Sequence, residues 1–245
     1  MDSHPVLTMA GRVVDLMFGA GNDARATACG SPLTTTQLID GLTADLRPTA
    51  PTGMAGRLAG AAVSGAVVSA LVLGAMLGFR TVPGTLRVYE ALAIKLIFAT
   101  SMLVLALWAA ECLSRPGEDK GARWRWLAAP VIGISAVAVG QLLGATDATR
   151  SGLVLGDSAL TCTAWIAVGS LPPMVALIRV MRGQAPTRPW LAGAVVGAGA
   201  GATSAAVYAL HCVETAIPFI GLWYSLGIIA AATIGAVAGS RLLRW

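Results

Sequence analysis

The chain has 245 residues, of which 56% are hydrophobic and 12% charged, and its mean hydropathy is +0.74. Soluble domains carry roughly 25% charged residues, so this composition excludes an ordinary soluble domain and indicates a membrane protein. The net charge of +5 does not indicate nucleic-acid binding, because no basic stripe follows one face of a soluble element. We therefore expect no direct contact with nucleic acid.

Residues 1–33 are expected to form a disordered cytosolic tail. They are mixed in polarity, and Arg12 and Asp15 interrupt the one apolar stretch that could serve as a signal peptide. We therefore expect no signal peptide in this segment.

Residues 34–46, TTTQLIDGLTADL, predict a short cytosolic amphipathic helix that Thr35 or Thr36 caps and Arg47-Pro48 ends. Such a helix either lies on the membrane or presents its apolar face to a protein. Because the segment has two Asp and no Lys, anionic lipid is a poor match and a protein partner is favoured. The binding segment and its linker then span 34–57, and the apolar face comprises Leu38, Ile39, Leu42 and Leu46.

Six apolar runs follow, each close to the ~20 residues that a helix needs to cross a bilayer. Continuous runs of this length predict helices, because barrel strands would be shorter and would alternate in polarity. The expected fold is an all-α integral membrane protein, with a six-helix domain over residues 58–245. The predicted spans are 58–79, 91–113, 126–145, 159–181, 190–211 and 217–239.

The orientation of the bundle follows from the distribution of Lys and Arg between the two sets of helix ends. One set holds eleven of these residues and the other holds only Arg80, Arg87 and Arg150. The richer set faces the cytoplasm, so both termini are cytoplasmic, and its charges favour anionic membrane lipid. The eleven are Arg47, Arg57, Arg115, Lys120, Arg123, Arg125, Arg179, Arg182, Arg188, Arg241 and Arg244.

Three features inside the spans predict helix packing and shape. Small residues recur at every fourth position, which is typical of close helix contacts. Pro172-Pro173 predicts a kink in the fourth span. Lys95 lies inside the second span, where it either snorkels to the outer interface or has a function such as pairing with Asp157 or Glu214. The small-residue repeats are Gly56/Gly60/Ser64, Gly193/Gly197/Gly201 and Gly235/Gly239.

Cys162 and Cys212 are the candidate functional thiols. Cys162 begins the fourth span and Cys212 closes the fifth, so both are expected at the oxidising outer face. Two such thiols could form a disulfide or, together with His211 and with Asp157 or Glu214, bind a soft metal ion. From spacing alone, two unrelated thiols are an equal alternative.

The other cysteines, Cys29 and Cys112, lie in reduced surroundings and are expected to be inert. No CxxC, HExxH, P-loop or nucleophile-elbow motif occurs in the chain, so we expect no enzyme.

Several motifs resemble the NrsF family of proteobacterial inner-membrane proteins, which are negative regulators of an extracytoplasmic-function sigma factor. The resemblance covers about residues 34–245 and includes Lys95. Val213 departs from it, because the family pattern has Pro there and a more rigid turn. The matching motifs are Gln37–Pro48, Leu160-Thr161-Cys162, Pro186–Pro189, Tyr208–Cys212 followed by Glu214, Leu222-Trp223-Tyr224 and Arg241–Trp245.

The resemblance implies an anti-sigma factor in the bacterial inner membrane. The N-terminal segment would hold the sigma factor through Leu38, Ile39, Leu42, Asp45 and Leu46. Cys162 and Cys212 would be the sensing pair for heavy-metal or oxidative stress, with a soft metal ion as a transient ligand. Two alternatives stay open, a small membrane transporter and a membrane thiol redox protein, and a homodimer is a further expectation.

Overall fold

A computed structural model describes residues 34–44, 53–78, 85–114, 123–184 and 186–244 of the chain. The chain divides into two compact units, residues 1–50 and residues 51–245. All regular structure in the described ranges is helical, which confirms the predicted all-α class.

The first unit contributes one described helix, α3 (Thr35–Ala44). Its cap is Thr34, one residue before the predicted Thr35 or Thr36: the backbone N–H of Gln37 donates to Thr34 Oγ1, and that of Thr34 donates to Gln37 Oε1. This reciprocal pair satisfies two amides at the helix start. Leu38 and Ile39 are about half exposed. The Leu42 side chain, Asp45 and Leu46 lie outside the described residues.

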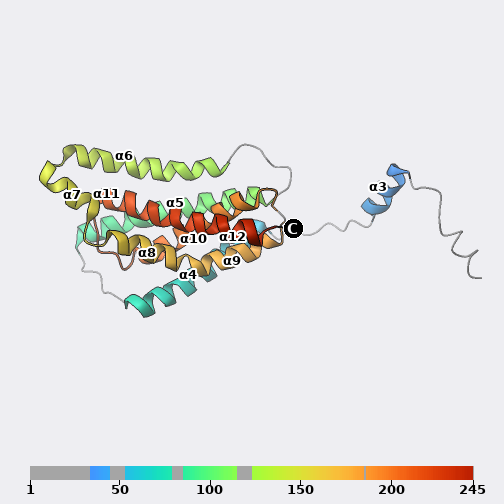
Figure 1. The fold of residues 1–245 in the computed structure, drawn as a ribbon, viewed down its shortest axis with the longest axis horizontal. Coiled ribbons are helices and arrows are strands. Elements are labelled where there is room, and N and C mark those ends of the chain that lie inside the picture. The colour runs from blue at the N-terminus through green and yellow to red at the C-terminus, as the bar shows by residue number, and fades with distance from the viewer. Residues whose placement is uncertain (1–33, 45–52, 79–84, 115–122, 185, 245) are drawn as a thin grey trace, which may run out of the picture. The chain divides into compact units, whose positions relative to one another are not determined.

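The second unit is built from six helical segments that are long and apolar enough to cross a membrane (Figure 1). Three are single helices, and the other three combine shorter helical pieces. In chain order they are α4 (Met54–Leu77); α5 (Leu86–Leu113); η1 (Arg123–Leu127) with α6 (Ala128–Gly144); α7 (Asp147–Leu155), α8 (Ala159–Gly169) and α9 (Leu171–Arg182); α10 (Pro189–Tyr208); and α11 (Ile217–Phe219), η2 (Ile220–Tyr224) and α12 (Ser225–Leu242).

Helix α10 is the centre of this bundle, and α6 lies at its edge. In α10, 78% of the most apolar window is buried, against α12, α5, α9, α4 and α8; the corresponding share in the η1–α6 segment is 11%. Gly, Ala and Ser make up most of α10, so neighbouring helices can approach its backbone from every side. The apolar outer faces of α4 and α6 suit contact with lipid.

The predicted glycine seam joins α10 to α12. A Cβ on Gly193 would collide with the backbone of Gly235 and Gly239, and one on Gly197 would lie 2.9 Å from the Cα of Ala232. The seam prediction is therefore confirmed for these two helices. It is wrong for Gly56 and the next glycine of α4, Gly60, because a Cβ on either would meet nothing within 4 Å.

The fourth span is broken, as its two prolines predicted. Helix α8 ends at Gly169 and α9 begins at Leu171, with Pro172 and Pro173 in its first turn, where a missing amide hydrogen does no harm. The sequence did not predict α7, which forms where a plain connection was expected. A salt bridge between Asp147 and Arg150 lies on its first turn.

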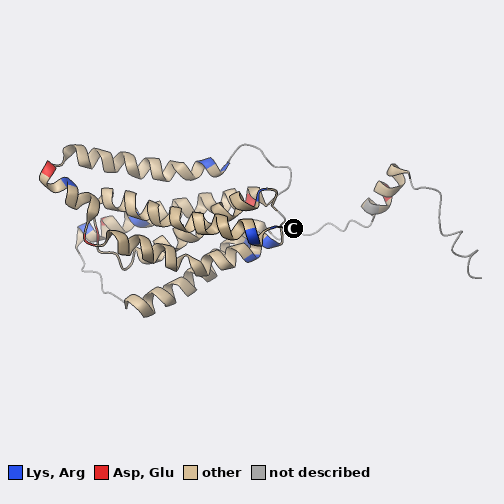
Figure 2. Ribbon diagram, in the orientation of Figure 1, with Lys and Arg blue, Asp and Glu red and all other residues tan. Residues whose placement is uncertain are grey.

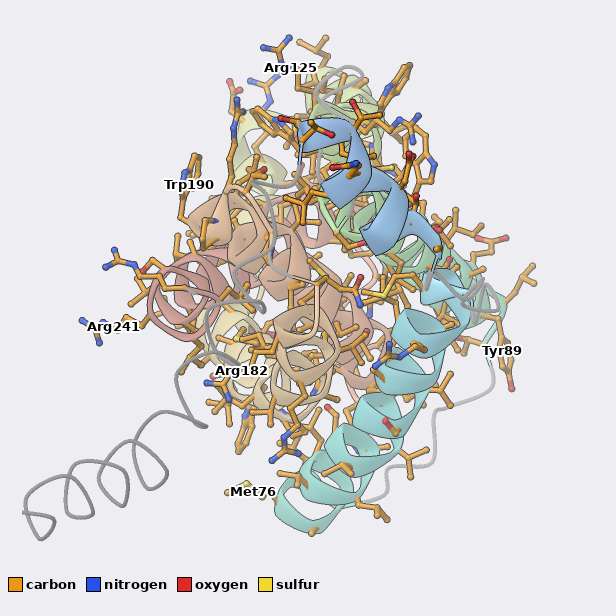
Figure 3. The ribbon with its side chains drawn as sticks, turned by 90° about the vertical axis from the view of Figure 1, so that its right-hand side faces the viewer. Met76, Tyr89, Arg125, Arg182, Trp190 and Arg241 are labelled. Carbon is orange, nitrogen blue, oxygen red and sulfur yellow. The ribbon has the colours of Figure 1, made fainter. Side chains whose placement is uncertain are left out.

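Charged residues gather at the helix ends, and Lys and Arg are concentrated at one end of the bundle (Figure 2). Alternation of the six segments brings Arg57 at the start of α4 to the same end as η1 with Arg125, the end of α9 with Arg182, and the end of α12 with Arg241. Figure 3 views this end, and there Arg125, Arg182 and Arg241 point outward. The opposite end holds the connections that carry the candidate thiols.

Candidate thiol site

Cys162 lies one turn into α8, and Cys212 lies in the connection that follows α10. The backbone N–H of Cys162 donates to Ser158 O at 2.8 Å, and that of Cys212 donates to Tyr208 O at 3.1 Å. Cys162 is fully buried and belongs to the main apolar core, against which Cys212 packs. Both side chains are thus fixed by the main-chain geometry at helix ends.

The two thiols lie close enough for the Cys162 thiol to act on Cys212, and both are free in the described structure. This interaction with the Cys162 thiol lowers the pKa of Cys212 below its ordinary value of 9.0, against the effect of burial, and the charge of Lys95 lowers this pKa further. A lowered pKa favours the thiolate, which is the form that reacts with oxidants and soft metals. The structure therefore brings together the two cysteines that the sequence could place only at one face.

Lys95 is buried at this site, with 1% of its surface exposed. Its Nζ donates to the carbonyl oxygen of Cys212 at 2.7 Å and lies 5.9 Å from the centre of the Tyr224 ring. The snorkelling alternative is wrong, because the side chain is enclosed by protein and does not reach the exposed surface. The expected pairing with Asp157 or Glu214 is replaced by this contact with a backbone carbonyl.

The Glu214 carboxylate instead joins the two thiol-bearing connections. Its Oε1 accepts hydrogen bonds from the backbone N–H of Asp157 at 3.0 Å and from Ser158 Oγ at 3.2 Å. Gly156 has φ +52°, and a Cβ there would lie 2.7 Å from the Phe219 ring and 2.9 Å from Glu214 Oε1. Glycine is thus required where this chain segment turns into α8.

His211 forms a hydrogen bond with the end of α4. Its Nε2 lies 2.9 Å from the carbonyl oxygen of Gly78, at the end of α4. Within the described ranges, no three His, Cys, Asp or Glu side chains gather in a way that could hold a metal ion. Soft-metal binding by Cys162, Cys212 and His211 stays a prediction.

Aromatic residues around the thiols were missed by sequence reasoning as parts of the site. The Tyr208 and Tyr224 rings lie 6.4 Å apart beside the cysteines, and Trp223 Nε1 donates to Val154 O at 2.8 Å. Tyr208 could have been found, because it lies one turn before Cys212. Tyr224 belongs to the Leu222-Trp223-Tyr224 motif of the family resemblance, but its place beside the thiols was not predictable, because the π-helical turn η2 that positions it has no clear sequence signal.

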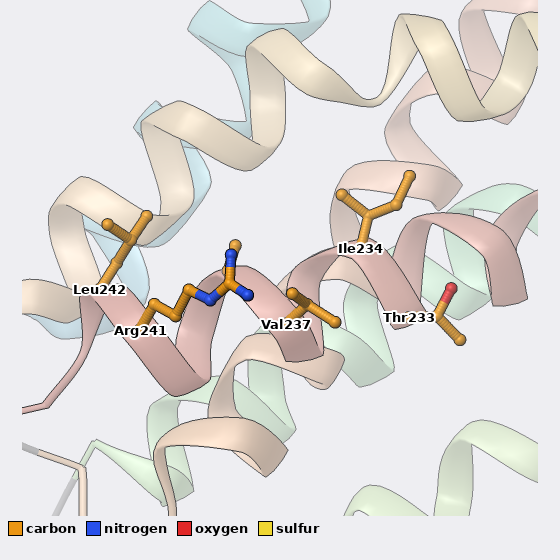
Figure 4. A pocket seen from close by; sticks show the side chains of 6 residues that line it. Thr233, Ile234, Val237, Arg241 and Leu242 are labelled. Carbon is orange, nitrogen blue, oxygen red and sulfur yellow. The ribbon is translucent and has the colours of Figure 1, made fainter.

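Three grooves on the bundle surface are lined almost wholly by apolar side chains and contain none of the predicted site residues. One of 570 Å³ follows α12 from Thr233 to Leu242, where Ile234, Val237 and Arg241 stand out from the helix (Figure 4). Grooves of 350 and 420 Å³ lie beside α5, the first toward α4 and α10 and the second toward α6. Such surfaces suit lipid chains.

Six helical segments long and apolar enough to cross a membrane, with Lys and Arg concentrated at one end and two neighbouring thiols at the other, define the class of this chain: an all-helical bundle protein. The sequence model of the NrsF family, "Negative regulator of sigma F", matches residues 42–245, and the chain belongs to that family. The match starts later than residue 34, where the sequence resemblance begins.

Two characterised relatives agree with this membership. The chain is 40% identical over 185 residues to "Probable anti-sigma-F factor NrsF" of Azospira oryzae, covering 74% of this chain and 85% of that protein. It is 37% identical over 213 residues to "Anti-sigma-F factor NrsF" of Caulobacter vibrioides, covering 86% and 99%. These relatives are named as regulators rather than enzymes. No solved structure matches the chain.

Proposed function

We propose that this protein is an anti-sigma factor of the bacterial inner membrane that holds an extracytoplasmic-function sigma factor and releases it under oxidative or heavy-metal stress. Membership of the NrsF family and the names of both relatives support the regulatory role. The six apolar segments and the Lys/Arg-rich end support a multi-pass protein with both termini in the cytoplasm.

The N-terminal helix α3 is the proposed sigma-binding element. Leu38 and Ile39 are exposed on it, although large apolar side chains are normally buried. An exposed apolar face on a short helix fits a groove on a protein partner. Leu42, Asp45 and Leu46 extend the proposed contact toward the linker.

Cys162 and Cys212 are the proposed sensor, and the proximity of their two free thiols in the same core cluster supports this proposal. Oxidation would remove two protons and two electrons from the pair, pass them to the oxidant and form one S–S bond. A soft metal would instead displace the protons and bind both sulfurs. Moving a two-state equilibrium from 1:99 to 99:1 takes about 5.5 kcal/mol, which a covalent or metal bridge can supply and an exposed ion pair cannot.

The decisive experiment is a Cys162→Ser, Cys212→Ser double variant in cells that carry a sigma-dependent reporter. We expect it to retain the sigma factor but to lose the response to the thiol oxidant diamide and to cadmium. A matched Cys29→Ser variant, altered in the N-terminal segment, should respond as the unmodified protein does. A normal response in the double variant would disprove the sensor role.

Deletion of residues 34–47 separates this proposal from its alternatives. An anti-sigma factor without this segment should leave the sigma factor free and the reporter permanently active. A small transporter or a thiol redox protein should leave the reporter unchanged. Co-purification of the full chain with a sigma factor would test the partner directly.

A further inference from the structure

The charged side chain of Lys95 lies in a buried position, where a charge lowers the stability of the fold. Its ammonium group is buried in the second apolar segment, and a charged group there is destabilising unless its partners satisfy it. Lys95 is satisfied by the Cys212 carbonyl and the Tyr224 ring. Loss of the hydrogen bond between Lys95 and the Cys212 carbonyl would therefore destabilise the fold.

This contact ties α5 to the connection that carries Cys212. If the Cys212 backbone shifts, Lys95 either follows it or is left buried with its hydrogen bond broken. Water cannot readily replace the carbonyl, because the ammonium is almost fully enclosed. Moving together with the Cys212 backbone costs less free energy than leaving the Lys95 ammonium without its acceptor. A movement at Cys212 should therefore displace α5.

The inner face of α5 suits such a displacement. It is a stripe of mostly small side chains on both sides of Lys95, and a Cβ on Gly199 of α10 would lie 3.3 Å from the Cβ of Ala106. Five of the eight buried residues of α5 are alanine, so few large side chains must repack if the helix slides or turns along α10. The eight are Ala91, Lys95, Phe98, Ala99, Met102, Ala106, Ala109 and Ala110.

The far end of α5 is joined to η1, which leads into α6. Arg123 Nη1 donates to Cys112 Sγ at 2.7 Å, and the Arg123 guanidinium lies 5.0 Å from the centre of the Trp108 ring. Helix α5 thus contacts the thiol site near one end and the Arg-rich end of the bundle at the other, without a break between Leu86 and Leu113.

We infer that Lys95 is a positioning residue that couples the state of the Cys162–Cys212 pair to α5, and that Arg123 passes the movement of α5 to η1 and α6. This inference rests on the proposed sensor role of the thiols and adds the route by which their bridging reaches the opposite end of the bundle. Lys95 takes no part in the bond that forms.

A Lys95→Met variant of the full chain tests the coupling with two readouts. The first is the fraction of the pair that diamide converts to a disulfide, measured by alkylation and mass spectrometry. The second is the sigma-dependent reporter. At saturating diamide we expect the disulfide still to form, although more slowly because the Lys95 charge no longer lowers the Cys212 pKa, while induction falls at least about fivefold, the lower end of typical coupling between sites. A Lys95→Arg variant should recover most of the induction.

The matched control is Arg87→Met, which removes an exposed cation from the same helix and should leave both readouts unchanged. Should Lys95→Met fail to accumulate, Arg123→Gln tests the far end of the route and is expected to uncouple oxidation from induction in the same way. Full induction in either variant, with the disulfide formed, overturns the inference.

Failure of this inference and failure of the sensor proposal are distinguishable. If the double cysteine variant still responds to diamide, the sensor role fails. If that variant is silent while Lys95→Met responds normally, the thiols sense without Lys95, and the coupling alone is disproved.

Discussion

The carboxylate of Glu214 accepts a hydrogen bond from the backbone N–H of Asp157, 3.0 Å away, and so joins the connection after α10 to the start of α8. The hydroxyl of Ser158 donates to the same oxygen. Since Cys162 follows Ser158 by one turn and Cys212 precedes Glu214 by two residues, this carboxylate sets the distance between the thiols. Four predictions concern the thiol site and the helix packing that supports it.

Glu214→Ala should loosen both thiol-bearing connections. Hydrogen bonds to a charged acceptor contribute about 1.5–3 kcal/mol each when buried, and the partial exposure of Glu214 reduces that figure. We expect a lower thermal midpoint in detergent and a slower diamide-driven disulfide. Glu214→Gln keeps an acceptor oxygen, so its thermal midpoint and its rate of disulfide formation should lie between those of the parent chain and of Glu214→Ala. Unchanged disulfide kinetics in Glu214→Ala would show that the clamp does not position the thiols.

Gly156→Ala should destabilise the fold by more than about 1 kcal/mol, because φ is +52° and the new Cβ would meet the Phe219 ring. Gly152→Ala is the matched control, since it lies in the preceding helix with nothing within 4 Å of its Cβ. Alanine there should be neutral or stabilising by up to about 1 kcal/mol. Thermal unfolding of both variants in the same detergent compares them, and equal midpoints would contradict the prediction.

Gly197→Ala should separate α10 from α12 and cost about 1–3 kcal/mol, which is typical of overpacking. The added methyl would meet backbone atoms of Ala231 and Ala232, which cannot move aside as a flexible side chain could. Gly140→Ala on α6, where a Cβ meets nothing within 4 Å, is the control and should be neutral or stabilising by up to about 1 kcal/mol. The free energy of unfolding in a denaturant series measures the difference.

The reactivity of Cys212 should persist to lower pH than that of an ordinary thiol, because the interaction with the Cys162 thiol and the charge of Lys95 lower its pKa. A group whose pKa falls on folding stabilises the fold above its unfolded pKa. That contribution is lost as the pH drops through the lowered value. The rate of iodoacetamide alkylation at Cys212, followed against pH by mass spectrometry, reports the midpoint.

Cys162→Ala removes the neighbouring thiol and should move this midpoint upward. Cys112→Ala, at the other end of α5, should not move it. A midpoint for Cys212 at the ordinary thiol value in the parent chain would contradict the assignment.

Sequence reasoning predicted the class and the six segments well, because composition and hydropathy respond directly to a bilayer. It misplaced the start of α5, since Arg87 and Glu90 lower the hydropathy of a turn that is nonetheless helical. Because of that error, Lys95 was expected within about one turn of the outer end of its helix. It also treated the Asp147–Leu155 stretch as a connection, although local hydrogen bonds hold it as helix α7.

The candidate site was predictable only as far as its two thiols. Loop charges and segment ends placed Cys162 and Cys212 at one face, but their contact depends on how α8 packs beside α10. At Gly169, for example, a Cβ would lie 3.1 Å from Leu73, so the approach of α8 to its neighbours is set by tertiary packing. No local pattern encodes that, nor the positive φ of Gly156.

The π-helical turn η2 sets which residues face the thiol site and which residues of α12 face α10. Before it, Phe219 packs near Gly156, and within it Tyr224 lies beside Lys95; after it, Gly235 and Gly239 face α10. Removing one residue from Ile220–Tyr224 would convert the turn to an α-helix and rotate one of these halves by about 100° relative to the other. When chains of this family are aligned, a single-residue gap in this turn would mark members in which the residues facing the thiol site are rotated relative to the residues of α12 that face α10.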